Sequence, residues 1–172
     1  MLTTEAPERS SAYRLGGLAL VLAAGVILTA LAFEHVGGYA PCPLCLMQRY
    51  AYYLAIPLLF VAMALGSEMP RLAAAIFAIV ALAFLANAGL GVYHAGAEWK
   101  FWPGPDTCGG AQALPTNATD LLTGLAETRV VRCDEPAWVF AGLSMAGWNA
   151  VVSLALFALT ARAAALAFSG RE

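Results

Sequence analysis

Residues 41–65 read PCPLCLMQRYAYYLAIPLLFVAMAL, a pair of cysteines followed directly by a long apolar run. The run covers about 20 mostly apolar residues, 46–65, which is the length that a helix needs to cross the hydrocarbon core of a bilayer. Three further stretches have the same character, at about 15–33, 72–93 and 139–168. The sequence therefore predicts an all-α membrane protein, a bundle of four transmembrane helices.

The composition supports this fold class and leaves little chain for anything else. Of 172 residues, 61% are hydrophobic and 12% are charged, and the mean hydropathy is +0.73. These values are typical of membrane proteins and exclude an ordinary soluble domain. We expect one membrane domain over residues 1–172, with a short loop at about 34–45 and a long loop at about 94–138. We read the first apolar run as a retained span because it is longer than the apolar region of a signal peptide.

The basic residues predict how the spans are oriented. Five of them belong to the same side of the four-span arrangement: Arg9, Arg14, Arg71, Arg162 and Arg171. Short loops rich in arginine and lysine stay in the cytoplasm, so both termini are expected there. The two loops at 34–45 and 94–138 then lie on the opposite side of the membrane.

All four cysteines fall in those two outer loops: Cys42, Cys45, Cys108 and Cys133. An even number of cysteines in an oxidising compartment favours two disulfides. Zinc is the alternative ligand, but structural zinc sites usually contain two closely spaced cysteine pairs, and the interval from Cys108 to Cys133 is too wide for a second one. We therefore expect no metal site.

The C-x-x-C pair at the start of the second span has the features of a reactive site. The amino terminus of a helix stabilises a thiolate, and Cys45 is closer to it than Cys42. Arg49 is four residues beyond Cys45, hence on the same helical face, where its charge favours a thiolate or an anionic ligand. The alternative role for Arg49 is that of an arginine reaching the membrane interface.

Other polar residues lie within or next to the spans. His94 follows the third span and either marks the interface or donates a proton or hydrogen bond to a reducible ligand. Asn87 and Asn149 lie inside spans, where hydrogen bonds between helices are expected. No role is predicted for Gln48. In the fourth span Gly142, Ala146 and Ala150 recur every fourth residue, the spacing that allows helices to approach closely.

With these residues in place, the sequence resembles the bacterial disulfide bond formation protein B (DsbB) family. The resemblance rests on CPLCLMQR at 42–49, YHAGAEWKFWPGPDTC at 93–108 and RCDEPAWVFAGLSMAGWN at 132–149. It implies a four-helix enzyme of the bacterial inner membrane with both termini in the cytoplasm and all cysteines in the periplasm. Its activity would be to reoxidise a periplasmic thiol oxidase of the DsbA type and to pass the electrons to a quinone, ubiquinone or menaquinone. No nucleic-acid partner is expected.

The resemblance also implies a role for each site residue. Cys108 and Cys133 would form the disulfide that the reduced partner attacks, at Cys108. Cys133 would then attack the inner pair at Cys42, which leaves Cys45 as a thiolate beside the quinone. Arg49 and His94 would be the residues near the quinone.

Two alternatives remain open at this point. An enzyme of the vitamin K epoxide reductase type runs similar chemistry, but its C-x-x-C follows the loop pair, whereas here it precedes it. A small membrane scaffold or transporter subunit with two structural disulfides is the alternative outside enzymology.

Overall fold

The computed structural model describes residues 5–65, 68–105 and 132–169. This part of the chain forms helices α1 (Glu5–His35), α2 (Pro43–Leu65), α3 (Pro70–Glu98) and α5 (Met145–Ser169), with two short strands, β1 (Val139–Phe140) and β2 (Leu143–Ser144). Within the described residues, four helices are long and apolar enough to cross a membrane. The predicted all-α, four-helix membrane fold is therefore confirmed.

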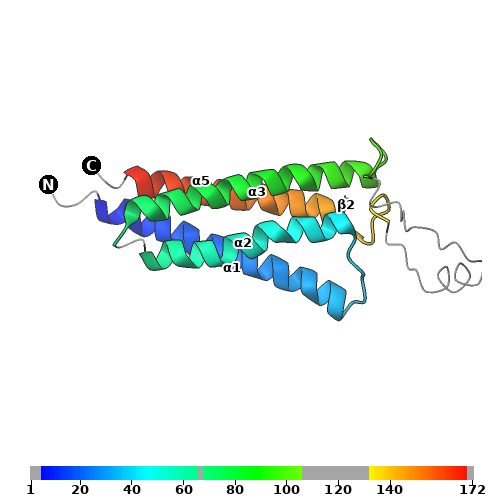
Figure 1. Ribbon diagram of the computed structural model, residues 1–172, viewed down its shortest axis with the longest axis horizontal. Coiled ribbons are helices and arrows are strands. Elements are labelled where there is room, and N and C mark those ends of the chain that lie inside the picture. Colours follow the sequence, from blue (N-terminus) through cyan, green and yellow to red (C-terminus); the bar gives the residue numbers. More distant parts are fainter. Residues whose placement is uncertain (1–4, 66–67, 106–131, 170–172) are drawn as a thin grey trace, which may run out of the picture.

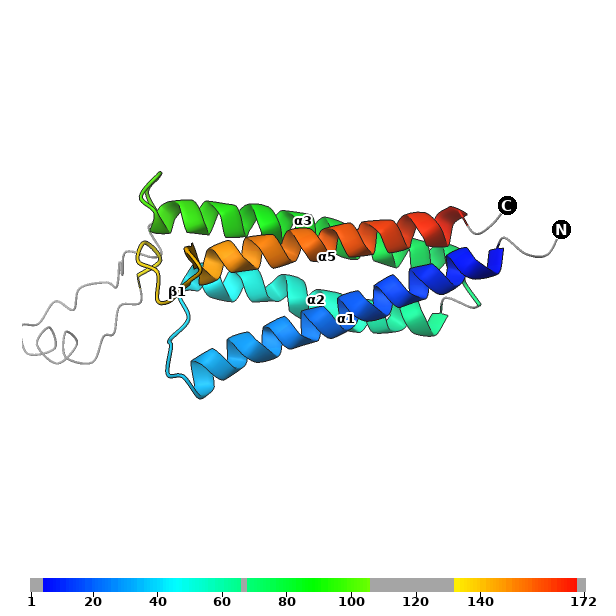
Figure 2. The same ribbon diagram turned by 180° about the vertical axis from the view of Figure 1, so that it is seen from behind.

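The helices lie alongside one another in an elongated bundle (Figures 1 and 2). Both ends of the chain lie at one end of the bundle, and the α1–α2 connection lies at the opposite end together with the segment that leads into β1. Toward that second end α1 diverges from the other helices, as both views show. The loops that carry Cys42 and Cys133 thus meet where α2, α3 and α5 are still close together.

The core of the bundle consists mostly of small and aliphatic side chains. Alanines 19, 23, 55, 62, 73 and 163 are buried in it, and the larger side chains Tyr52, Phe77 and Phe84 fill the space between them. Tyr52 and Phe84 meet edge to face, with ring centroids 5.4 Å apart. Since lipid is as apolar as these side chains, close packing rather than the hydrophobic effect holds such helices together.

Helix α3 approaches α5 closely at Gly91. A Cβ atom at this position would lie 3.0 Å from the backbone of Ala150 in α5, so any larger residue would push the two helices apart. Ala150 and its neighbour one turn earlier, Ala146, are both buried, as the predicted small-residue spacing requires. Gly142, the third residue of that predicted series, is not part of the helix.

The fourth helix begins later than predicted. Residues 139–144, which we expected to be its first turns, form an antiparallel hairpin in which Val139 pairs with Ser144 and Phe140 with Leu143. Its turn contains two residues with positive φ, Ala141 (51°) and Gly142 (81°), a conformation that no helix can include. Hydropathy alone did not separate the apolar residues of the hairpin from those of the helix.

The second and third helices extend beyond their predicted ends at the end where the cysteines lie. Helix α2 begins at Pro43 instead of 46, and α3 continues to Glu98 instead of ending at Tyr93. Residues 94–98 are all buried, so packing keeps them helical although two of them are polar. His94 is consequently part of a helix and not of a loop.

Candidate active site

Cys42 and Cys45 lie at the start of α2, as predicted. Cys42 immediately precedes the helix, and its sulfur caps it by accepting the backbone N–H of Cys45 at 3.1 Å. Both cysteines are free thiols, so the disulfide predicted between them is not formed in this structure. The structure thus shows the pair in its reduced, dithiol form.

The two thiols differ in their surroundings. Cys42 is 3% exposed, whereas Cys45 is half-buried. The side-chain hydrogen bond with Cys45 raises the pKa of Cys42, and burial raises it further. Cys42 is therefore a weaker acid than an ordinary cysteine, and the assignment of Cys45 as the thiolate of the pair stays a prediction.

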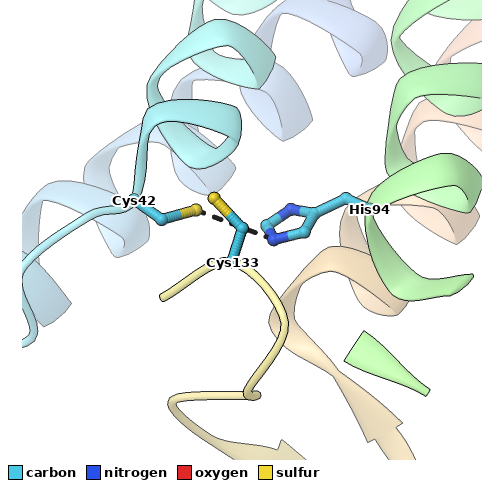
Figure 3. Close-up of side chains that lie close together, drawn as sticks. All are labelled: Cys42, His94 and Cys133. Carbon is cyan, nitrogen blue, oxygen red and sulfur yellow. Dashed lines mark hydrogen bonds between the residues drawn. The ribbon is translucent and has the colours of Figure 1, made fainter. Parts of the chain in front are cut away.

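Cys133 lies directly against this pair (Figure 3). It is 1% exposed and packs with Cys42 and Leu44 in a small cluster that also touches Cys45 and Leu90. Its sulfur is in a disulfide, and since Cys42 and Cys45 are free, neither of them is its partner. Cys108, the partner predicted from the family, lies outside the described residues.

Three groups meet at this point: the sulfurs of Cys42 and Cys133 and the imidazole of His94. The Sγ atoms and a ring nitrogen all lie within 4.8 Å of one another, and His94 Nε2 is 3.6 Å from Cys42 Sγ (Figure 3). Thiolates and imidazole are ligands that zinc accepts. In this state, however, Cys133 offers a disulfide sulfur and no thiolate, so the arrangement is suited to sulfur exchange rather than to metal binding.

Arg49 has a partner that the sequence did not reveal. Its Nη1 atom donates a hydrogen bond to Oε2 of Glu34, at the end of α1, at 2.5 Å. The Arg49 side chain is 12% exposed and that of Glu34 is 26% exposed. No motif in the sequence marks Glu34 as a partner, because it lies 15 residues from Arg49 along the chain. The pair shows that the cation next to the thiols is partly balanced by a carboxylate.

A chain of polar side chains connects His94 with the interior of the bundle. His94 Nδ1 lies 2.9 Å from Gln48 Nε2, and Gln48 Oε1 accepts a hydrogen bond from Asn149 at 2.7 Å. Deeper in the bundle, Asn87 donates to Ser153 at 2.9 Å. The predicted interhelical hydrogen bonds of Asn87 and Asn149 are therefore confirmed. The role of Gln48 was missed, because its partners are distant in sequence.

Glu98 lies one helical turn beyond His94. Its Oε1 atom is 3.8 Å from His94 Nε2, and the residue is 8% exposed. A buried carboxyl group at this distance adds a second acceptor near the imidazole, although it lies farther from Nε2 than the sulfur of Cys42 does.

Charged groups at the surface attach the Cys133 segment to the end of α3. Asp134 accepts hydrogen bonds from Lys100 at 2.6 Å and from Arg132 at 2.8 and 2.9 Å. The hydrogen bond from Arg132, together with that from Lys100, holds the pKa of Asp134 well below its ordinary range. The carboxylate is therefore charged at every physiological pH, and its contact with Lys100 connects the segment that carries Cys133 to the end of α3.

The sequence of this protein is similar to those of known proteins. A family model described as "Disulfide bond formation protein DsbB" matches residues 13–163. The chain is 32% identical over 155 residues to disulfide bond formation protein B of Marinobacter nauticus, covering 85% of this chain and 90% of the relative. It is 36% identical over 166 residues to disulfide bond formation protein B 2 of Pseudomonas aeruginosa, covering 93% and 90%. No solved structure matches the chain.

Proposed function

The chain belongs to the disulfide bond formation protein B family, and from this premise we propose the route that its electrons take. They enter from the dithiol of a DsbA-type partner, pass through the pair Cys108 and Cys133, continue through Cys42 and Cys45, and leave to a quinone in the membrane. The protein itself is a multi-pass membrane oxidoreductase that forms disulfide bonds.

One observation carries the proposed route. Cys42 is a free thiol, Cys133 is in a disulfide, and their sulfurs lie within 4.8 Å of each other. Disulfide exchange requires a sulfur attacker next to a disulfide and proceeds through a mixed disulfide. The proximity supports a mixed disulfide between these two residues. The same arrangement disfavours a scaffold with two permanent structural disulfides.

Each exchange step then balances without any group beyond sulfur. The thiolate of Cys133 attacks Cys42 in the oxidised inner pair, a Cys42–Cys133 bond forms, and Cys45 leaves with the electron pair as a thiolate. A thiolate of the loop pair next attacks Cys133 and releases Cys42. The inner pair has then gained two electrons and the loop pair is a disulfide again. The free thiols of Cys42 and Cys45 and the disulfide-bonded sulfur of Cys133 support this as the end state of the exchange.

The surroundings of Cys45 fit a lipid-soluble quinone. Exposed apolar and aromatic side chains follow it along α2: Leu46, Met47, Tyr50 and Tyr53. Arg49 has five N–H donors and uses one of them on Glu34, so others remain for a carbonyl oxygen. When bound, a quinone supplies the capacity to accept two electrons and two protons. Arg49 is the residue we propose to hold it. The family resemblance adds His94, whose side chain contacts Cys42, Gln48 and the backbone of Cys133.

We further propose that the termini face the cytoplasm and that the cysteines face the periplasm of a bacterial inner membrane. The five arginines near the termini and at the 66–71 link support this orientation. A periplasmic position also gives the DsbA-type partner access to the loop pair.

Turnover of the purified protein tests the route. Full-length protein in detergent, given a reduced DsbA-type partner and excess ubiquinone, should reduce the quinone, as followed by its ultraviolet absorbance. Cys45→Ser should abolish quinone reduction, while Cys42 and Cys133 can still be trapped as a mixed disulfide. Sustained turnover by the Cys45→Ser variant would contradict the proposed route. Cysteines that stay oxidised in quinone-depleted cells would instead favour the scaffold.

A further inference from the structure

We propose that Gln48 is a positioning residue that fixes His94 as the Nε2–H tautomer and directs that N–H toward the sulfur of Cys42. The inference deepens the proposed function, since it rests on Cys42 taking part in sulfur exchange. It assigns His94 to the exchange step between the two cysteine pairs, in addition to any contact with the quinone.

The contact between Gln48 and His94 determines the tautomer. The amide nitrogen of Gln48 is always a donor, so His94 Nδ1, 2.9 Å away, must be the acceptor. A neutral imidazole that accepts at Nδ1 carries its proton on Nε2. The Nε2 atom lies 3.6 Å from Cys42 Sγ, a distance at which an N–H can donate to the large sulfur atom.

The orientation of the Gln48 amide is coupled to that of the next side chains in this hydrogen-bonded series, Asn149 and Tyr52. Its Oε1 accepts from Asn149 Nδ2 at 2.7 Å, and Asn149 Oδ1 accepts from the Tyr52 hydroxyl at 2.6 Å. If the Gln48 amide alone turned over, its NH₂ group would face that of Asn149, and two donors would oppose each other. The amides of Gln48 and Asn149 can therefore reverse only together.

The hydrogen bonds deeper in the bundle are donated in the same direction, toward His94. Ser153 lies 3.4 Å from the Tyr52 hydroxyl, and its own oxygen accepts from Asn87 Nδ2 at 2.9 Å. Because Tyr52 already donates to Asn149, Ser153 must be the donor to Tyr52. In each hydrogen bond of the series from Asn87 to His94, the acceptor is therefore the group nearer to Cys42 in the series. Gln48, Tyr52, Asn87 and Ser153 are buried, so an unmade bond within the chain is costly.

This polarised chain serves the step that releases Cys42 from the Cys42–Cys133 mixed disulfide. A loop thiolate attacks Cys133, a new disulfide forms there, and Cys42 departs with the electron pair as a thiolate. A thiolate in so buried a position is destabilised unless it receives hydrogen bonds. The backbone N–H of Cys45 already donates one to Cys42 Sγ at 3.1 Å, and the Nε2–H of His94 adds a side-chain donor without giving up its proton. Two other groups face this imidazole: the backbone carbonyl of Cys133, which also accepts a hydrogen bond from His94, and Oε1 of Glu98, which lies 3.8 Å from Nε2, farther than the sulfur of Cys42 at 3.6 Å.

Nitrogen-15 NMR of the full-length protein in nanodiscs tests the tautomer directly. The chain contains two histidines, and His35→Gln leaves only His94 to be observed. At neutral pH we expect Nε2 to carry the proton and Nδ1 to be bare. In Gln48→Glu, which differs from the native residue by one group, the carboxylate can only accept, so the proton should move to Nδ1. A proton on Nδ1 in the native protein, or an unchanged tautomer in Gln48→Glu, overturns the inference.

A kinetic measurement tests the consequence. In quinone-free protein, a reduced DsbA-type partner reduces the loop pair, and the inner pair then gains electrons by exchange, which rapid acid quenching and thiol labelling can follow. Loss of a hydrogen bond to a charged sulfur should slow this step about tenfold in Gln48→Glu. Thr160→Val is the matched control, because Thr160 is a buried polar residue of α5 that does not belong to the hydrogen-bonded series. This variant should exchange electrons at the native rate.

The two measurements separate the inference from the proposed function. The expected tautomers with an unaltered exchange rate in Gln48→Glu would refute the role of His94 at Cys42 and leave the electron route intact. Native protein that shows the expected tautomer but cannot exchange electrons between the two pairs would refute the route itself.

Discussion

At the scale of single residues, Arg49 illustrates how one contact can both position a charged side chain and offset part of its charge. A guanidinium on the same helical face as Cys45 was predicted to favour a thiolate or an anionic ligand. In the structure Glu34 accepts one of its N–H groups, and both side chains are largely shielded from solvent. The carboxylate holds the guanidinium in place at the end of α1, while it offsets part of the positive charge.

Substitution of the two partners should therefore have unequal effects. Arg49→Ala removes the N–H donors proposed to hold the quinone, so the apparent KM for ubiquinone should rise about tenfold while the KM for the dithiol partner is unchanged. Glu34→Gln leaves the guanidinium present, and the KM for ubiquinone should stay at or below the native value. Steady-state kinetics in detergent measures both constants. An equal rise in both variants would contradict a direct role for Arg49.

Asp134 provides a prediction about pH. Its pKa is lowered by Arg132 and Lys100, so its stabilising contact is complete above the ordinary carboxyl pKa of about 3.9 and is lost only when the pH falls through the lower pKa of the folded protein. Asp134→Asn should remove the contact at every pH. Amide hydrogen exchange of residues 132–138, compared at equal pH, should then be faster in the variant at neutral pH and at about pH 5.

Glu135→Gln is the control for this experiment. Glu135 approaches Arg132 at 3.4 Å, so its substitution removes a neighbouring charge and leaves the contact between Asp134 and Lys100 in place. Equal exchange rates in the Asp134→Asn variant and the native protein would show that this contact does not hold the segment.

The local chemistry of the site was predictable from the sequence, but its tertiary contacts were not. Spacing along the chain placed Cys45 and Arg49 on one helical face directly after Cys42, because such spacing is a property of the helix itself. Pairing of Gln48 with His94 depends on how α2 packs against α3, and no local pattern encodes that packing. For the same reason no local pattern indicates that Glu34 faces Arg49.

At the scale of elements, the ends of the helices show where hydropathy is a poor guide. Val139 and Phe140 are apolar but belong to a hairpin, because the positive φ angles of Ala141 and Gly142 interrupt any helix. Glu98 is polar, and yet it belongs to α3, because it is buried by neighbouring elements. Hydropathy records the affinity of a segment for lipid, whereas the end of a helix depends on backbone angles and on packing.

The close contact of α3 with α5 gives a stability prediction. Gly91→Val should destabilise the bundle by about 1–3 kcal/mol, since the added carbons would meet the backbone of Ala150. Gly89→Val is the matched control, because no atom lies within 4 Å of a Cβ at that position. Thermal unfolding in detergent should show a clear fall in Tm for the first variant and a small one for the second. A similar fall in Tm in both variants would mean that valine destabilises α3 itself and that the contact with Ala150 is not the cause.

At the scale of the whole molecule, the arrangement separates the termini from the chemistry. Both termini lie at one end of the bundle, while Cys42, Cys45 and Cys133 lie at or near the other. An even number of spans produces this separation, and the sequence predicted it from the positions of the apolar runs. What hydropathy could not predict is which helices meet at the cysteine end.

Reporter fusions test the orientation that we propose. Alkaline phosphatase folds only after export, so it should be inactive when fused after Glu172 and active when it replaces the chain beyond Gly104. A fluorescent protein fused at the same two positions should give the reverse pattern. Phosphatase activity at Glu172 would show that the termini face the periplasm and that the arginines do not govern the insertion of this chain.

The length of α3 has a consequence for the environment of the thiols. Its 29 residues rise about 44 Å at 1.5 Å per residue, whereas the hydrocarbon core is about 30 Å thick. The helix is therefore longer than the core is thick, and we expect its last turns, which carry the polar residues His94 and Glu98, to lie among the lipid headgroups. Anionic headgroups attract protons to the surface and lower the local pH, which reduces the thiolate fraction of any cysteine there. Lipid composition and ionic strength thereby become determinants of how fast this protein introduces disulfides.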